Sequence, residues 1–157
     1  MKRKPIKRIS DRKKIINKCK DLIRAALKIE RGAFCEICGK PEADLPYPLS
    51  LFHILNTQRY PRMELHRFNI LLSCWCPAKY YYMPYCHNIW HHSSPDDPKF
   101  QRVHNKIVEL RGKDYIDTLR GIDKLQPKMT MTHIHMMHEA FKHEAKTLEE
   151  NNEIYRF

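Results

Sequence analysis

Cys86-His87-Asn88-Ile89-Trp90-His91-His92 places one thiol and three imidazoles within seven residues, shortly ahead of Pro95. The pattern predicts a short helix over 85–92 that ends before the proline. His87 and His91 are four residues apart, so on a helix they project from one face and could share one divalent ion. His92 points about 100° away from His91 and is expected to meet phosphate or solvent.

Two apolar runs precede this helix and predict short strands. The first, Ser50-Leu51-Phe52-His53-Ile54, lies in a candidate strand over 49–55. The second, Phe68-Asn69-Ile70-Leu71-Leu72-Ser73-Cys74, lies in a candidate strand over 68–74. Both runs have the length and apolar content of buried strands. The sequence therefore predicts a ββα unit, with a histidine in the first strand and an asparagine at the second.

Four cysteines flank this unit with metal-ligand spacing. Cys35-x-x-Cys38 has the form of half a zinc knuckle, and Gly39 suits the tight turn that follows it. Cys74 and Cys86 would complete a tetrahedral four-thiolate site, with Cys76 as a competitor for either place. A structural zinc ion contributes on the order of 10 kcal/mol or more to folding such small units, which bury little apolar surface alone. The alternative is that some of these cysteines carry no metal.

In their order along the chain, these residues resemble the HNH endonuclease family over about 34–100. The resemblance implies an α+β fold with a small zinc-stapled ββα-metal core and flanking N- and C-terminal helices. More loosely, Arg67-Phe68-Asn69-Ile70 followed by cysteine is similar to phage NinG-type recombination proteins. The family's activity is metal-dependent hydrolysis of DNA phosphodiester bonds, and the expected products carry a 5′ phosphate and a 3′ hydroxyl.

The resemblance also assigns roles to individual residues. His53 is expected to be the general base, taking a proton from the attacking water. Asn69 is expected to hydrogen-bond His53 and fix its tautomer and plane. His87 and His91 are expected to hold Mg²⁺ or another divalent cation, so that His87 belongs to both the catalytic and the metal-binding sets.

The chain departs from the family pattern in two places. Many members carry an aspartate or histidine as a further metal ligand immediately before the general base, whereas this chain has Phe52. The second cysteine pair is usually spaced as CxxC, whereas eleven residues separate Cys74 from Cys86. The first departure predicts low metal affinity in the free protein.

The rest of the chain is predicted to be helical. Three segments are expected: a basic tail and amphipathic helix over 1–33, the zinc-containing core over 34–100, and a helical extension over 101–157. In the first helix, Cys19 falls on the apolar stripe and is expected to be a small buried hydrophobe. Further helices are predicted over 98–112 and 130–150, with a further piece over 113–120 between them. His135 and His138 in the last helix are given no chemical role.

The charge of the chain favours a polyanionic partner. The sequence has 29 Lys and Arg against 18 Asp and Glu, a formal net charge of +11, which points to nucleic acid and most directly to DNA. Lys13, Lys14 and Arg67 are the candidate phosphate contacts, although any single lysine on the first helix could equally be a solvated side chain. The aromatic run Tyr80-Tyr81-Tyr82 could stack on bases, but packing near the zinc site is the commoner role.

No apolar stretch approaches the roughly 18 residues of a membrane span, and no secretory signal follows the basic N-terminus. A cytoplasmic location in a bacterial or phage-infected cell is therefore expected, with a homo-oligomer possible. The predicted function is a metal-dependent HNH-type DNA endonuclease. The alternative is a zinc-stabilised, non-catalytic nucleic-acid-binding protein, and a structural or packaging protein is a third class.

Overall fold

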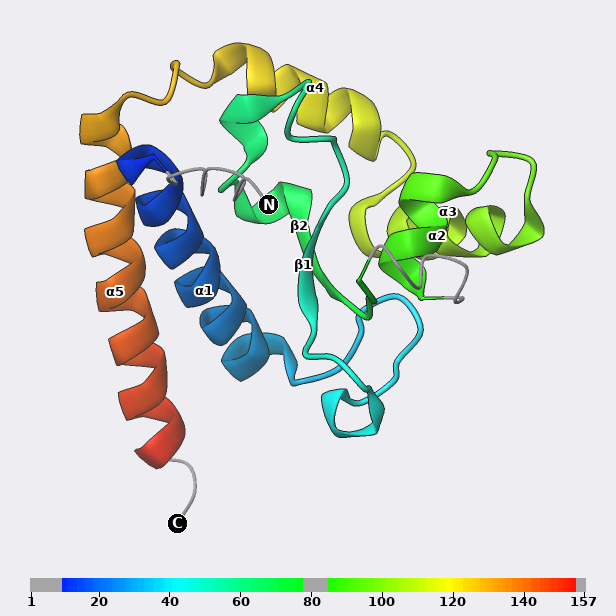
Figure 1. Ribbon diagram of the computed structural model, residues 1–157, viewed down its shortest axis with the longest axis horizontal. Helices are drawn as coiled ribbons and strands as arrows, with labels where there is room; N and C mark the ends of the chain where they lie inside the picture. Colours follow the sequence, from blue (N-terminus) through cyan, green and yellow to red (C-terminus); the bar gives the residue numbers. More distant parts are fainter. Residues whose placement is uncertain (1–9, 78–84, 155–157) are drawn as a thin grey trace, which may run out of the picture.

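The computed structural model describes residues 10–77 and 85–154 and has an α+β fold (Figure 1). The helices are α1 (Asp11–Arg31), α2 (Cys86–His92), α3 (Pro98–Arg111), α4 (Tyr115–Leu125) and α5 (Met131–Ile154). The strands are β1 (Ser50–His53) and β2 (Ile70–Ser73), and the 3₁₀ turns are η1 (Glu42–Asp44), η2 (Pro61–Met63) and η3 (Arg67–Asn69). The basic tail over 1–9 and the run Tyr80-Tyr81-Tyr82 lie outside the described residues, so their predicted roles stay predictions.

The two strands form one antiparallel sheet. Ser50 pairs with Ser73 and His53 with Ile70, which sets the ends of the ladder. Each strand is shorter than its predicted range. Past His53 the Ile54 N–H still donates to the Asn69 carbonyl (3.0 Å), and the following N–H, that of Leu55, donates to the Asn69 side chain (2.7 Å). Asn69 therefore ends the turn η3 instead of lying inside the second strand.

The exposed edge that β2 would otherwise present is covered by Glu36. The backbone N–H of Glu36 donates to the Leu72 carbonyl (2.9 Å), and its carboxylate accepts the Leu72 N–H (2.6 Å). Arg31 at the end of α1 holds that carboxylate at 3.0 Å. An unpaired strand edge invites association with other chains, and these bonds close it. All four residues of β2 are consequently buried.

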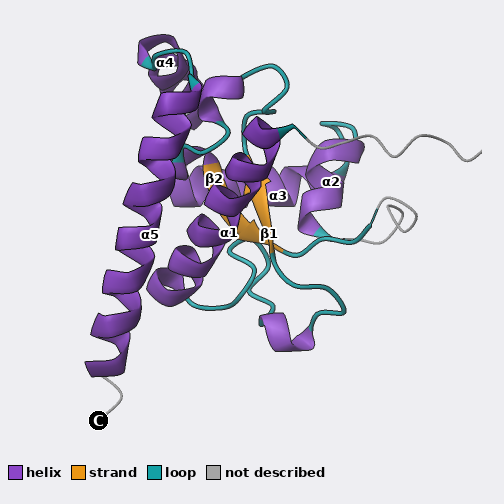
Figure 2. Ribbon diagram, turned by 60° about the vertical axis from the view of Figure 1, so that its left-hand side comes forward, coloured by secondary structure: helices purple, strands orange, loops and turns teal. Residues whose placement is uncertain are grey.

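Helices cover the sheet from two directions. In both views α1 and α5 run side by side on one side of the hairpin, and α2 and α3 pack on the other (Figures 1 and 2). Ser10 caps α1 by accepting the Lys13 N–H (3.3 Å), and Gly32 ends it with φ 91. Trp90 of α2 stacks on Phe100 of α3 with ring centroids 4.8 Å apart.

One hydrophobic core joins the three predicted segments. Ile23 of α1, Leu71 of β2 and Ile134 of α5 all belong to it. Cys19 is fully buried in that core, which confirms its prediction as a small buried hydrophobe. The piece expected over 113–120 is helical from Tyr115 and runs on to Leu125 as α4. Among the described helices, none is both long and apolar enough to span a bilayer.

Candidate metal centre and histidine site

Four cysteine thiols gather where the loop after α1, the end of β2 and the start of α2 meet. Sulfur atoms of Cys35, Cys38, Cys74 and Cys86 all lie within 4.8 Å of one another. The Cys38 and Cys74 sulfurs are 3.8 Å apart, about the S···S edge of a tetrahedron with Zn–S bonds of about 2.3 Å. The four cysteines could therefore hold a metal ion such as zinc, which confirms the predicted grouping.

The negative charge of ionised thiols in this cluster favours a bound cation. Hydrogen bonds from Cys74 and Cys86 lower the pKa of Cys35 far below its usual range. The bond to Cys35 in turn raises the pKa of Cys74 to about 12. Bonds to Cys35 and Cys74 raise the pKa of Cys86. One thiolate thus opposes ionisation of the others. A divalent ion would relieve that repulsion and let all four ligate as thiolates.

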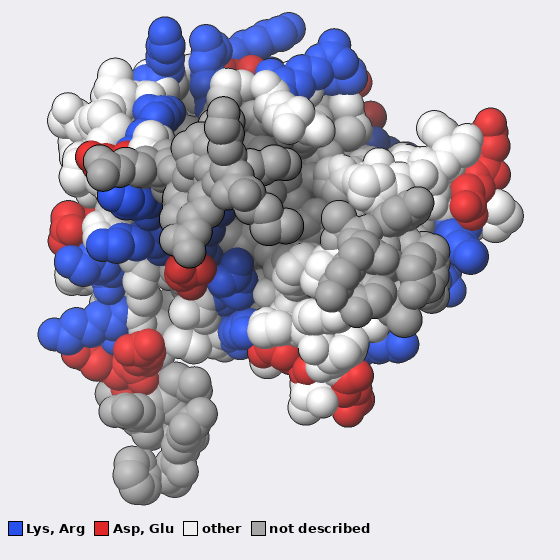
Figure 3. Space-filling model, in the orientation of Figure 1, with Lys and Arg blue, Asp and Glu red and all other residues white. Residues whose placement is uncertain are grey.

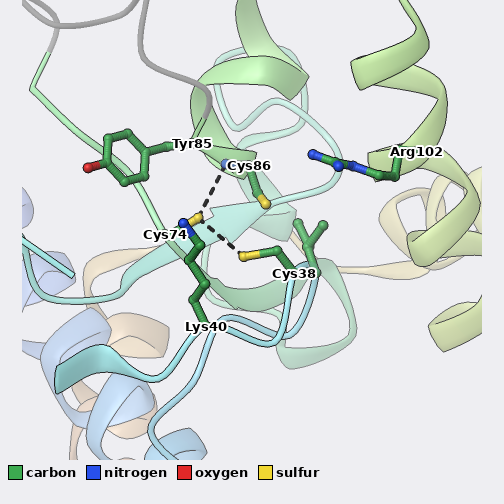
Figure 4. A pocket seen from close by; sticks show the side chains of 7 residues that line it. Cys38, Lys40, Cys74, Tyr85, Cys86 and Arg102 are labelled. Carbon is green, nitrogen blue, oxygen red and sulfur yellow. Dashed lines mark hydrogen bonds between the residues drawn. The ribbon is translucent and has the colours of Figure 1, made fainter. Parts of the chain in front are cut away.

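Two basic side chains also approach the cluster. A cavity of about 670 Å³ opens over it, lined by Ile37, Cys38, Lys40, Cys74, Tyr85, Cys86 and Arg102. Lys40 and Arg102 extend toward the sulfur atoms from opposite sides (Figure 4). A zinc ion with four thiolates carries a formal charge of −2, which two cations would offset. Lys40 and Arg102 are therefore placed where they would offset that charge if the cysteines held zinc.

The cysteine cluster also holds α2 in place. The Cys74 sulfur accepts the backbone N–H of Cys86 (3.3 Å), and the Cys74 carbonyl accepts the backbone N–H of His87 (3.1 Å). These two bonds therefore attach the first turn of α2 to the end of β2. Because His87 and His91 are on that helix, the cysteine cluster also fixes where both histidines lie.

Cys76 stands outside the four-sulfur group of the described residues. Both ends of the Asn88 amide hold its backbone instead, accepting the Cys76 N–H (3.1 Å) and donating to the Cys76 carbonyl (3.3 Å). The four-sulfur group of the described residues thus contains Cys74 and Cys86, the two preferred in the sequence, and does not contain Cys76. Asn88 is buried and was not singled out from the sequence.

His53 ends β1 with its ring half-buried. Its Nε2 lies 2.9 Å from the Glu64 carbonyl, which can only accept, so Nε2 carries the proton and Nδ1 the free lone pair. Burial lowers the pKa of His53 to about 4, and the charges of Lys20 and His91 add to that effect.

The predicted bond between Asn69 and His53 is wrong in this structure. Asn69 is fully buried, and its side-chain amide bonds only to backbone groups. The amide oxygen accepts the Leu55 N–H, and the amide nitrogen donates to the carbonyls of Leu55 (3.2 Å) and Met63 (3.1 Å). It closes the loop between the strands. Since Glu64 follows Met63, Asn69 holds the loop that carries the carbonyl bonded to His53.

His87 is oriented by Ser50 across the sheet. The Ser50 hydroxyl donates to the Ser73 carbonyl (3.3 Å) and lies 2.7 Å from Nδ1 of His87. The hydroxyl has one proton, so both bonds form together only if Nδ1 of His87 is the donor. Nε2 of His87 then keeps its lone pair, which is the form that binds a metal. Burial, followed by the charges of His91, His53 and His92, lowers the pKa of His87 to about 4.

His91 completes the helical pair, as its spacing predicts. The rings of His87 and His91 have centroids 4.9 Å apart, and His91 is exposed at the surface. Protein atoms packed around its ring nevertheless lower its pKa, and the neighbouring charge of His92 adds to this. The charge of His91 also lowers the pKa of His53. The three imidazoles therefore occupy one electrostatic neighbourhood.

Phe52 fills the space beside the helical pair. It is fully buried, and its ring centroid lies 5.6 Å from that of His87 and 6.0 Å from that of His91. A phenyl ring cannot bind a cation, so the histidines have no third protein ligand at this position. Among the described residues, the group of three or more potential ligands that lie close enough to share an ion consists of the four cysteines and does not include these histidines.

The predicted phosphate contacts differ in their surroundings. Arg67 pairs with Glu30 of α1 and Glu144 of α5, so its charge is neutralised inside the fold and its predicted role in binding nucleic acid is not supported. Lys14 pairs with Asp11 at 2.9 Å on the surface of α1. Lys13 is exposed on the same turn. Sequence reasoning gave Arg67 a ligand role because the distant acidic partners could not be seen.

Two further elements of the site were not predicted. Ser50 orients His87, but a serine at the start of a strand carries no signal that it will face a histidine of a later helix. The Glu64 carbonyl orients His53, and any residue could supply a carbonyl, so only the path of the loop reveals it. Comparison with protein families, with curated proteins and with solved structures gives no match to this chain.

Proposed function

We propose that this protein is a metal-dependent HNH-type endonuclease that hydrolyses DNA phosphodiester bonds, by nicking or by cutting both strands. The observation that carries the proposal is the His53–Glu64 bond, which leaves Nδ1 of His53 unprotonated. An imidazole in that form can accept a proton from an attacking water. It stands beside two further imidazoles of α2, a combination that a purely structural role does not require.

His53 has the protonation state that a base needs at neutral pH. With its pKa lowered to about 4 by burial, the ring is neutral at pH 7. A low pKa also makes it a weak base, but a nearby phosphate anion would raise that pKa in the complex. Proton transfer from water to Nδ1 is thus favoured when DNA is bound, and Nε2–H stays with the Glu64 carbonyl throughout.

His87 and His91 are the residues that would hold a divalent ion, through Nε2 of His87 and a ring nitrogen of His91. The Ser50 hydroxyl, 2.7 Å from Nδ1 of His87, supports this, because a proton donated by Nδ1 to Ser50 leaves the lone pair on Nε2. A bound ion would neutralise the scissile phosphate and stabilise the leaving oxygen. The four cysteines would hold a structural zinc that fixes α2, and reduced cysteines agree with a reducing compartment such as a bacterial cytoplasm.

Cleavage of supercoiled plasmid tests the proposal. Zinc-loaded protein is incubated with plasmid and Mg²⁺, Mn²⁺ or Ni²⁺, and relaxed and linear forms are separated on a gel. We expect metal-dependent nicking or linearisation, with 5′ phosphate and 3′ hydroxyl ends that a ligase reseals. Absence of cutting with all three ions, in protein that still binds DNA, would contradict the proposal.

That second outcome describes the alternative function, a zinc-stabilised nucleic-acid-binding protein without catalysis. Phe52 is the observation that favours it, because the position before the general base offers no ligand and the ring occupies the space beside His87. The alternative leaves the orientation of His53 and His87 without a purpose, so we rank it second.

A further inference from the structure

A second site is suggested by cations that the fold does not neutralise. Most basic side chains of α1 have an acidic partner: Lys20 pairs with Glu64 and Lys28 with Glu42. Arg12 and Arg62 differ, because each donates to a neutral backbone carbonyl, of Met129 (2.9 Å) and Asp123 (3.1 Å) respectively. A carbonyl fixes a guanidinium without cancelling its charge.

These two arginines lie in one cavity with Lys128. The cavity has a volume of about 410 Å³ and is lined by Arg12, Pro61, Arg62, Lys128 and Met129, so no acidic side chain of the described chain is in its lining. Within residues 10–77 and 85–154, Lys128 has no ion-pair partner. Three cations from α1, η2 and the α4–α5 linker therefore converge on one open space.

The cationic cavity continues into an apolar groove. This groove, about 230 Å³, shares Arg62 and Met129 with the cavity and is further lined by His66, Gln126, Pro127, His133, Met136 and Met137. Met136 is 65% exposed, an unusual state for so apolar a side chain. Nδ1 of His66 in the wall is buried without a hydrogen-bond partner. The whole surface thus offers positive charge at one end and soft apolar contacts at the other.

The surrounding surface has the same sign. Lys and Arg side chains gather along the upper edge of the molecule in the view of Figure 3, over α4 and the linker between α4 and α5. We infer that the cavity and its groove bind a DNA strand, with a phosphate at Arg12, Arg62 and Lys128 and an adjacent sugar or base against the methionines. Each arginine keeps further N–H donors for phosphate oxygens, and methionine packs readily on the face of a base.

Other occupants fit less well. A symmetric contact between two copies of this chain would bring the uncompensated cations of both copies together. DNA supplies the opposite charge and suits the chain's net charge of +11. The inference rests on the proposed function for the identity of the ligand. Its position agrees with that function, because Arg62 lies two residues before Glu64, whose carbonyl orients His53.

The test measures DNA binding in a protein that cannot cut. The variants are made in a His53→Ala background, and fluorescence anisotropy follows binding of a labelled oligonucleotide, single-stranded and duplex, over a range of salt. Lys128→Gln is the main variant, since Lys128 makes no ion pair that its loss would break. Arg62→Gln is the second, with circular dichroism as the check on folding. Lys146→Gln is the control, because it makes the same charge change on α5, where Lys146 pairs with Glu150.

We expect Lys128→Gln to reduce the slope of log affinity against log salt by about 0.9 on duplex or about 0.7 on single-stranded DNA. At 0.1 M salt this equals a loss of about eightfold or fivefold in affinity. Lys146→Gln should change neither. Met136→Ser should weaken binding about threefold without changing the slope, because it removes a contact to sugar or base and no charge.

Equal effects of Lys128→Gln and Lys146→Gln would overturn the inference, since only net charge would then matter. A Met136→Ser variant that alters self-association and leaves DNA affinity unchanged would also overturn it, in favour of a contact between copies. If the wild type binds DNA in the expected way but never cuts, the nuclease proposal fails and the groove stands. Cutting by a wild type whose Lys128→Gln variant binds normally would remove the groove alone.

Discussion

The ring of Phe52 meets that of His87 edge-on, with centroids 5.6 Å apart and planes at 79°. The phenyl edge thereby occupies the space in which a third metal ligand would face the two histidines of α2. Phe52 is fully buried, so no water replaces that ligand there. The proposed catalytic ion therefore depends on two imidazoles, on water and on the DNA phosphate.

Replacing Phe52 with histidine should increase metal affinity. Phe52→His places an imidazole beside His87 and His91, and we expect Mn²⁺ or Ni²⁺ to bind about tenfold more tightly or better, because a third protein ligand joins the ion. Isothermal titration of zinc-loaded protein measures the change. The metal-free variant should lose about 2 kcal/mol or more of stability from its polar group in the core.

Phe52→Leu is the control, since it keeps the position apolar and adds no ligand. If Phe52→His and Phe52→Leu bind these ions equally, the α2 histidines do not form a metal site with that position.

Loss of one zinc ligand should disorder α2. Cys74→Ser removes a ligand and replaces the sulfur that accepts the Cys86 N–H, so we expect loss of the bound zinc and faster amide hydrogen exchange in 86–92. Elemental analysis gives the zinc content. Cys76→Ser is the matched control, and it should keep one zinc per chain. Equal zinc loss in both variants would show that Cys76 is a ligand.

Stability should fall in mild acid because of the buried histidines. The pKa of His53 is lowered to about 4 in the folded protein, against about 6.5 in an unfolded chain. Between these values the unfolded state binds more protons, so the free energy of unfolding decreases as the pH falls from about 6.5 toward 4, by about 1 kcal/mol per pH unit for this residue. His87 acts in the same direction.

Urea denaturation from pH 6.5 to 5, in excess zinc, measures this slope. His53→Gln keeps an N–H donor for the Glu64 carbonyl but does not titrate, so its slope should be shallower than that of the wild type by about 1 kcal/mol per pH unit. Parallel slopes in the two proteins would mean that the ring of His53 titrates as it does in water.

Asn69 should act on His53 through the loop. Asn69→Ala leaves three backbone groups of Leu55 and Met63 without partners, and we expect a loss of about 3 kcal/mol in the free energy of unfolding. DNA cleavage should fall as well, because the Glu64 carbonyl would no longer be held. Asn56→Ala provides the control, since the side chain of that exposed asparagine accepts one local bond, from the Gln58 N–H. Similar losses in both variants would show that the bonds of Asn69 to Leu55 and Met63 stabilise the fold no more than one exposed local bond does.

The parts of the fold that depend on local pattern were predictable. The apolar stripe around Cys19 predicts α1, and the spacing of His87 and His91 predicts a helix that presents both rings together. The cysteine spacing predicts the four-sulfur cluster, since few arrangements of this chain satisfy four ligands at once.

The parts that depend on distant packing were not predictable. Arg67 reads as a free cation in the sequence, yet it meets Glu30 and Glu144 from helices at opposite ends of the chain. The sequence suggests Asn69 as a partner of His53, yet the Asn69 side chain bonds to backbone groups of Leu55 and Met63 in the loop between the strands. The cations of Arg12, Arg62 and Lys128 are far apart in sequence, and only the fold brings them to one cavity.

The general base is the central claim, and single-turnover cleavage tests it most directly. A labelled duplex is incubated with excess zinc-loaded protein and Mg²⁺, and the cleavage rate and the binding affinity are measured together for the wild type and His53→Ala. We predict a rate about 10²- to 10⁴-fold lower in His53→Ala with DNA affinity changed less than about twofold. Cutting by His53→Ala at the wild-type rate would contradict the account.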